Sequence, residues 1–242
     1  MMKITSLIAA RHADAFGNRP ARIVCLGDSV THGCFEVFIN RSGSIDTVYD
    51  TPSGYVRMLQ DELLGLYPAS AVSVINSGIS GDSTTGALKR FDRDVAVYNP
   101  DLVTVNLGLN DSMAADAEAS LETYRANMSE IFRRIKALGA EAMLVTPNMM
   151  CSYVDPSLPE GLLRNIAAEA AKRQTGGVLT AFVDSAREIA REAGIPIADA
   201  YAHWQALEHA GVDTTALLSN HINHPTRKMH DVFARKIIEQ LL

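Results

Sequence analysis

Short apolar runs alternate with longer amphipathic segments along most of the chain. Each short run is continuously apolar or rich in β-branched residues, which is typical of strands in a parallel sheet covered on both faces. The runs predict five strands, at residues 22–26, 72–76, 102–107, 142–146 and 179–183.

Amphipathic helices are predicted between these strands. In residues 121–138 apolar side chains recur every three or four positions, and Gly139 follows as a helix stop. The other predicted helices cover residues 52–66, 84–98, 158–174, 185–193 and 227–242. Strands that alternate with helices pair in parallel through right-handed crossovers. The pattern therefore predicts an α/β fold, a three-layer αβα sandwich with a five-stranded parallel sheet, in which residues 1–242 form a single domain.

Two long segments, 34–52 and 147–159, carry no predicted helix or strand. The first contains Gly43, Ser44 and Asp46, and the second contains Asn148 and Tyr153. Because loops of this length inside a compact domain are commonly functional, we expect both to border the active site.

Composition excludes several classes of function. The chain has 242 residues and a net charge of −6, with no concentration of lysine and arginine, so we expect no nucleic-acid partner. Its three cysteines form no CxxC pair, which favours reduced thiols over disulfides or a zinc ribbon. Polar residues from Arg11 onward interrupt the apolar N-terminal run, so neither a signal peptide nor a membrane span is predicted. We predict a cytoplasmic protein.

Small polar turns follow the first three predicted strands. Ser29 lies in the first turn, Gly81 in the second and Asn110 in the third. Parallel strands share one carboxyl edge, where ligands bind in open α/β sheets, so we expect these turns to meet. His224 lies in a fourth polar segment, just before the last helix. The sequence therefore predicts a hydroxyl, a glycine turn, an amide and an imidazole at one site.

Ester hydrolysis requires this set of groups. A serine hydroxyl becomes a strong nucleophile when a histidine within hydrogen-bond reach removes its proton, which indicates Ser29 as nucleophile and His224 as base. The tetrahedral intermediate needs donors aimed at its oxyanion, and loss of one donor costs about 2.7–4 kcal/mol. We expect these donors to be the backbone N–H groups of Ser29 and Gly81 and the side-chain amide of Asn110.

At these four blocks the chain resembles the SGNH hydrolases, also called the GDSL esterase and lipase family. The blocks are Gly-Asp-Ser at 27–29, Ser-Gly-Asp at 80–82, Gly-Leu-Asn-Asp at 108–111 and His-Pro at 224–225. The resemblance implies a flavodoxin-like sandwich and a serine hydrolase that acts on esters without a metal or an organic cofactor. Similarity to the acetylesterase-like branch implies an acetyl group on a small-molecule or carbohydrate ester.

One position departs from the family pattern. The family usually has an aspartate three residues before the histidine, and this chain has His221 there. That aspartate normally fixes the tautomer of the imidazole and stabilises its charged form. Asn220, Asn223, a backbone carbonyl or an acid from elsewhere in the chain are the candidates to orient His224.

Three alternative functions follow from the same residues. Histidines 221, 224 and 230 with Asp231 suggest a metal site, but their spacing matches no known ligand pattern and would leave the serine, glycine and asparagine blocks unexplained. A lysophospholipase or thioesterase would need an apolar groove. A catalytically silent binding module would explain the absent aspartate.

Several other polar and aromatic residues have structural interpretations. We expect Asp28 and Asp111 to shape turns, His32 to cap a helix or line the pocket, and Asp184 and Asp199 to cap helix starts. Helical spacing places Tyr201, Trp204 and Met229 in the core.

Overall fold

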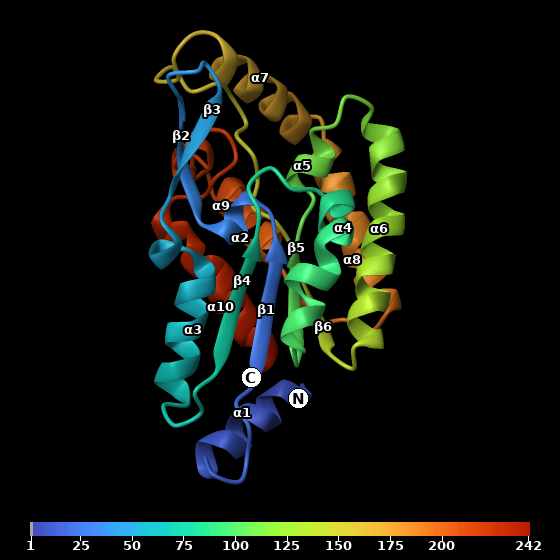
Figure 1. Cartoon of the computed structure of the whole chain (residues 1–242). Helices are drawn as coiled ribbons and strands as arrows, with labels where there is room; N and C mark the ends of the chain where they lie inside the picture. Colours follow the sequence, from blue (N-terminus) through green and yellow to red (C-terminus); the bar gives the residue numbers. More distant parts are fainter. Residues whose placement is uncertain (1) are drawn as a thin grey trace.

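The central sheet has five parallel strands in the order β4-β1-β5-β6-β7 (Figure 1). We describe a computed structural model, which covers residues 2–242. The sheet strands are β1 (Arg22–Gly27), β4 (Ser73–Gly78), β5 (Leu102–Asn106), β6 (Glu141–Val145) and β7 (Ile197–Ala198). Numbered along the chain the order is 2-1-3-4-5, the flavodoxin-like order, and the predicted fold class is confirmed.

Both faces of the sheet are buried. In β1, Ile23 and Cys25 belong to one hydrophobic cluster, while Val24 and Leu26 belong to the other. Successive side chains of a strand point to opposite faces, so a strand between two helical layers must be apolar at every position. This explains the continuous apolar run of β1.

Helices cover the two faces in separate layers. One layer contains α4 (Thr84–Asp94), α6 (Ala117–Ala137) and α8 (Val178–Glu192), which Figure 1 shows together on one side of the sheet. The opposite cluster draws on α1 (Lys3–Ala13), α3 (Tyr55–Leu66), α7 (Leu162–Thr175), α9 (Ala200–His209) and α10 (His230–Leu241). Tyr201, Trp204 and Met229 are buried in that cluster, which confirms their predicted core positions.

The prediction of a strand at 179–183 was wrong. These residues lie inside α8, and the fifth strand is the two-residue β7, which pairs with β6. The buried residues of α8 recur at helical spacing, so the apolar run is part of a helix stripe rather than a strand. The predicted helix at 185–193 is the second half of α8. Asp184 therefore lies within a helix instead of capping one, whereas Asp199 caps α9 as predicted.

The segment 34–52 is more ordered than predicted. It forms an antiparallel hairpin of β2 (Cys34–Ile39) and β3 (Ile45–Tyr49), followed by the short helix η1 (Thr51–Ser53). Asn40 closes the turn, because its side-chain oxygen accepts the N–H groups of Ser42 and Ser44. The hairpin lies at the same end of the molecule as α7 (Figure 1).

Helix α1 was not predicted from the sequence, and the other remaining elements are short. The carboxylate of Glu141 accepts the N–H groups of Lys3 and Ile4 at the first turn of α1. No helix within residues 2–242 has the length and apolar character needed to cross a membrane. The short helices are α2 (Ser29–His32), α5 (Leu109–Ser112), η2 (Ala96–Tyr98), η3 (Thr215–Leu217) and η4 (Arg227–Met229).

Candidate active site

Ser29 is the first residue of α2, immediately beyond the carboxyl end of β1. Asp28 caps this helix, since its side chain accepts the N–H of Val30 at 3.0 Å. Gly27 is required at the turn because a Cβ there would overlap the side chain of Thr31. The sharp turn therefore places the Ser29 hydroxyl at the edge of the sheet, next to the point where the strand order reverses.

His224 is held by a compact loop before η4. The side-chain oxygen of Asn220 accepts the backbone N–H groups of Ile222, Asn223 and His224. This fold of the loop directs the imidazole toward α2, and His224 Nε2 lies 2.9 Å from Ser29 Oγ.

The other imidazole nitrogen faces a backbone carbonyl. His224 Nδ1 lies 2.8 Å from the carbonyl oxygen of Phe35 in β2. Because a carbonyl can only accept, Nδ1 carries the proton and Nε2 is left to accept the Ser29 hydroxyl. Of the groups that the sequence analysis named as candidates to orient His224, the structure therefore has a backbone carbonyl in this role. Asn220 instead organises the loop, and His221 turns away toward Asp155, with Nδ1 3.3 Å from Oδ2.

Burial keeps His224 neutral. Removal from solvent lowers the pKa of the imidazole, and the Phe35 carbonyl and the nearby Glu36 carboxylate raise it only in part. A lowered pKa leaves the ring unprotonated at neutral pH, which is the form that can take a proton from serine.

Arg227 fixes the hairpin that carries the Phe35 carbonyl. Its guanidinium donates to Glu36 in β2 at 2.6 Å and to Asp50, just after β3, at 2.7 Å. The same group lies 4.3 Å from the centroid of the Phe35 ring. Arg227 therefore connects both strands of the hairpin to the segment that follows His224.

Three residues with hydrogen-bond donors line the same cavity as the imidazole. Asn110 Nδ2 donates to the backbone oxygen of Asp82 at 2.8 Å, which leaves its second N–H free to point into the cavity. Within residues 2–242, the backbone N–H groups of Ser29 and Gly81 donate to no protein group. Ser29, Gly81, Asn110 and His224 line one cavity of about 330 Å³. The structure thus brings together all four residues singled out in the sequence.

Arg90, which the sequence analysis missed, joins the turns that carry Ser29 and Gly81. It is buried in α4 and donates to the backbone oxygens of Gly27 at 2.9 Å and Ser77 at 2.7 Å, and to the Asp82 carboxylate at 2.6 Å. The sequence could have revealed Arg90 as a charged residue on the buried face of an amphipathic helix, because such a residue is buried only when it has a partner.

Two buried carboxyl groups, those of Asp28 and Asp111, adjoin Ser29 and Asn110 along the chain. Burial raises the pKa of Asp28 to about 7, with further contributions from Asp111 and Asp82, against the Val30 N–H. Burial also raises the pKa of Asp111, whose carboxylate accepts the backbone N–H and hydroxyl of Thr84 at the start of α4. These contacts confirm the structural roles expected for both aspartates.

The other histidines have separate partners. His230 Nδ1 accepts the backbone N–H of Tyr55 at 3.1 Å, and His32 Nδ1 accepts that of Ser80 at 3.3 Å. Across the described chain, residues 2–242, no three histidine, cysteine, aspartate or glutamate side chains are grouped so as to hold a metal ion. The residues of the metal alternative are therefore not brought together.

Comparison with known proteins places this site in context. The model of the GDSL-like lipase/acylhydrolase family matches residues 25–232. An acetylxylan esterase of Geobacillus stearothermophilus is 27% identical over 133 residues, and the esterase TesA of Pseudomonas aeruginosa is 32% identical over 126 residues. Each match covers 52% of this chain, and 59% and 60% of those two proteins respectively, so the chain spans less than two thirds of their length.

Solved structures show a similar fold over nearly the whole chain. The acetylxylan esterase Axe2 of G. stearothermophilus superposes with a TM-score of 0.68 at 20% identity, covering 92% of this chain and 94% of that one. A lipase/acylhydrolase of Enterococcus faecalis gives a TM-score of 0.66 at 23% identity, covering 90% and 94%. At these identities the likeness concerns the fold alone.

Proposed function

The chain belongs to the GDSL-like lipase/acylhydrolase family, and from this premise we propose that it is a serine ester hydrolase that removes a short acyl group, acetyl, from a small-molecule or carbohydrate ester. The observation that carries the proposal is the 2.9 Å contact between Ser29 Oγ and a neutral His224 whose second nitrogen is held by the Phe35 carbonyl.

The proposed reaction has two stages. In the first, His224 Nε2 takes the hydroxyl proton as Ser29 Oγ attacks the ester carbonyl carbon, and the N–H groups of Ser29, Gly81 and Asn110 receive the oxyanion. When the intermediate collapses, the C–O bond to the alcohol breaks and Nε2 gives its proton to the departing oxygen. In the second stage, water attacks the acyl-serine with the same base, and the acid is released with Ser29 restored.

The short acyl group and the carbohydrate are supported by different features. The cavity of about 330 Å³ is small, and its wall includes Asp46, Thr47, Ser80 and Asn223, whose polar groups suit the hydroxyls of a sugar. The curated relative and the solved structure from Geobacillus stearothermophilus are both named acetylxylan esterase. A longer acyl ester or thioester is the second candidate, because an apolar groove adjoins the cavity.

A chain-length series tests the proposal. We expect hydrolysis of p-nitrophenyl acetate to exceed that of the longer esters up to decanoate, to persist with a chelator, and to fall by about 10⁴-fold or more in Ser29→Ala. The thermal midpoint of the variant should match that of the wild type.

Each other outcome contradicts a part of the proposal. Activity that survives in Ser29→Ala would exclude the serine mechanism, and a preference for decanoate would favour the long-chain candidate. Activity lost with the chelator alone would indicate a metal site. A wild-type protein that cleaves none of these esters would favour a binding module.

A further inference from the structure

A second hollow, of about 460 Å³, lies beside the active-site cavity. One wall is β2, the other is the segment 157–163 that leads into α7, and residues 219–221 complete the lining. We call this hollow the side groove. Its apolar side chains include Val37, Ile39, Leu158, Pro159, Leu162 and Leu163.

The side groove adjoins the reaction site. Val37, Leu163 and Asn220 line both the active-site cavity and the groove. The two spaces therefore lie next to one another, with these three side chains at their common boundary.

The position of the side groove relative to the catalytic groups indicates whether the groove faces the acyl half or the alcohol half of an ester. Residues 219–221, which lead into His224, line the groove, whereas the oxyanion donors Gly81 and Asn110 do not. In the proposed reaction the departing alcohol oxygen must accept the proton of His224 Nε2, so the alcohol half lies on the histidine side. The groove lies on that side of the site.

We propose that the side groove binds the alcohol half of the substrate, and that this half is an uncharged alkyl or aryl group. The inference rests on the proposed esterase function and, of the two substrate classes proposed there, selects a small-molecule ester over a carbohydrate ester. The substrate would then join a short acyl group to an apolar alcohol.

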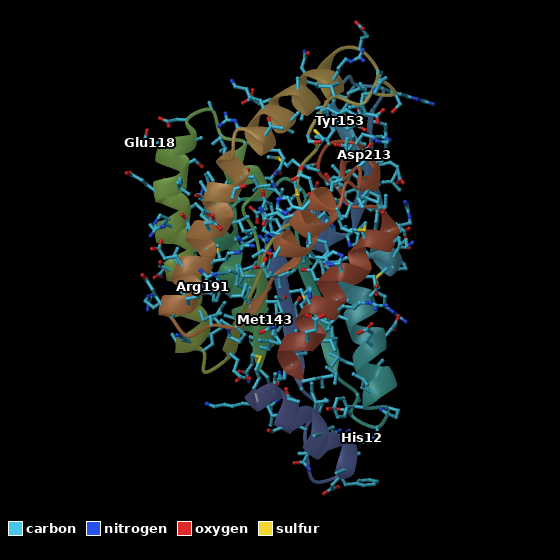
Figure 2. The ribbon with its side chains drawn as sticks, turned by 180° about the vertical axis from the view of Figure 1, so that it is seen from behind. His12, Glu118, Met143, Tyr153, Arg191 and Asp213 are labelled. Carbon is cyan, nitrogen blue, oxygen red and sulfur yellow. The ribbon has the colours of Figure 1, made fainter. Side chains whose placement is uncertain are left out.

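Contacts next to the groove hold the chain on both sides of it. Tyr153 donates its hydroxyl to Asp213 at 2.6 Å, and Figure 2 shows these two residues next to one another at the end of the molecule that carries α7. The backbone N–H of Ser152 donates to Thr215 Oγ1 at 3.0 Å. These contacts anchor the chain just before the segment 157–163, and Arg227 anchors β2 through Glu36.

Exposure and charge favour an apolar, uncharged ligand. Ile39 and Leu162 are 43% and 49% exposed at the rim, and adjoining exposed apolar side chains commonly mark a binding site. Of the described residues, no lysine or arginine lines the groove, and its carboxylates Glu36 and Glu160 are paired with Arg227 and Arg164. A phosphate-bearing alcohol such as a lysophospholipid headgroup would meet no lysine or arginine among these lining residues, and the imidazole that lines the groove, that of His221, faces the carboxylate of Asp155.

Two isomeric esters distinguish the proposal from the alternative that the groove binds the acyl half. Hexyl acetate and ethyl hexanoate contain the same atoms, but the long chain is on the alcohol in the first and on the acyl group in the second. Ethyl acetate is the short reference for both. In the wild type we expect kcat/KM for hexyl acetate to exceed that for ethyl acetate by about tenfold or more, from the burial of the added methylenes.

The variant Ile39→Thr/Leu162→Gln makes the rim polar without touching the reacting groups. It should lower the hexyl acetate preference by about tenfold and leave ethyl acetate and ethyl hexanoate within about twofold of the wild type. Leu66→Gln is the matched control, because Leu66 is an equally exposed helical leucine (50%) outside the groove, and it should change none of the three.

Two results with these esters would overturn the proposal. If ethyl hexanoate, rather than hexyl acetate, responds to the variant, the groove holds the acyl half. If neither ester responds, the groove binds neither half. If the wild type cleaves no ester, the proposed function fails, and 1-hexanol titrated into the protein then tests the groove alone. The methyl resonances of Ile39 and Leu162 should shift in that titration, and unchanged resonances would contradict the site.

Discussion

At the scale of single residues, the unusual feature is what orients His224. The Phe35 carbonyl accepts from Nδ1, and His221 occupies the position at which the sequence pattern led us to expect an aspartate. A carbonyl dipole selects the tautomer as well as a carboxylate does. It stabilises the protonated ring less, because it brings no full negative charge.

The titration of His224 leads to a prediction about the pH dependence of activity. Its pKa is lowered by burial, and only the neutral ring can accept the Ser29 proton, so activity should rise with pH through a midpoint below 6.5 and then level off. The measurement is kcat/KM for p-nitrophenyl acetate between pH 4 and pH 8. His221→Asn is the control, because His221 faces Asp155 at a backbone φ of 53° that asparagine tolerates. A midpoint above 6.5, or one that moves in this variant, would contradict the assignment of His224 as base.

Asp28 leads to a prediction about stability. Its pKa is raised by burial to about 7 in the folded protein, from 3.8, so between these values the folded state holds a proton that the unfolded state has lost. Stability therefore falls as pH rises through that window, by about 1.4 kcal/mol per pH unit. Asp28→Asn keeps the acceptor for Val30 and cannot ionise.

We expect Asp28→Asn to melt above the wild type at pH 8, with a difference that closes toward pH 4. Thermal melts followed by circular dichroism measure both. Asp116→Asn is the control, because Asp116 caps α6 in an exposed position. A difference between Asp28→Asn and the wild type that stays constant with pH would show that the Asp28 charge does not matter to folding.

At the scale of elements, the β2–β3 hairpin determines whether the site is assembled. Within residues 2–242 its two strands pair with each other and with no strand of the central sheet, so its placement over the site depends on side-chain contacts. Arg227 supplies two ion pairs and a contact with the Phe35 ring. Because β2 carries the carbonyl that orients His224, we assign Arg227 as a positioning residue.

Loss of Arg227 should therefore affect catalysis more than binding. We expect Arg227→Gln to lower kcat for p-nitrophenyl acetate by about 10- to 100-fold with little change in KM, since a small displacement of an orienting group has effects of this size. Arg227→Lys should recover part of the loss, because an ammonium can pair with one carboxylate but cannot bridge two. Arg133→Gln, at an exposed arginine paired with Glu130 in α6, is the control. If Arg227→Gln lowers the melting temperature but leaves kcat unchanged, the role of Arg227 is structural only.

At the scale of the whole molecule, the central sheet lies between two hydrophobic clusters and contributes side chains to both. Alternate residues of β1, β5 and β6 belong to opposite clusters, so neither helical layer can be removed without exposing the sheet. This arrangement supports the prediction that residues 1–242 fold as one domain.

A single domain should unfold in one transition. The only tryptophan, Trp204, is fully buried in α9 and reports on one layer, whereas far-ultraviolet circular dichroism reports on helices of both layers. We expect the two signals to give the same midpoint and slope in urea. Separate midpoints would show that the layers unfold independently.

The layered fold and the four residues that line the cavity could be predicted from local sequence pattern. Strand and helix periodicity are local, and parallel strands necessarily bring their following turns to one edge. Local pattern was not enough to assign strands correctly where a segment was very short or fitted both a strand and a helix. The two-residue β7 is too brief to show a period, and the apolar run at 179–183 suits a buried strand as well as the inner stripe of α8.

The group that orients His224 and the groove beside the cavity could be identified only once the folded chain was known. A backbone carbonyl is present at every residue, so nothing in the sequence distinguishes that of Phe35. Its position depends on ion pairs from Arg227 to Asp50 and Glu36, which are 177 and 191 residues away along the chain. The side groove likewise forms between β2 and the segment before α7, which meet only after the sheet and its helices have assembled.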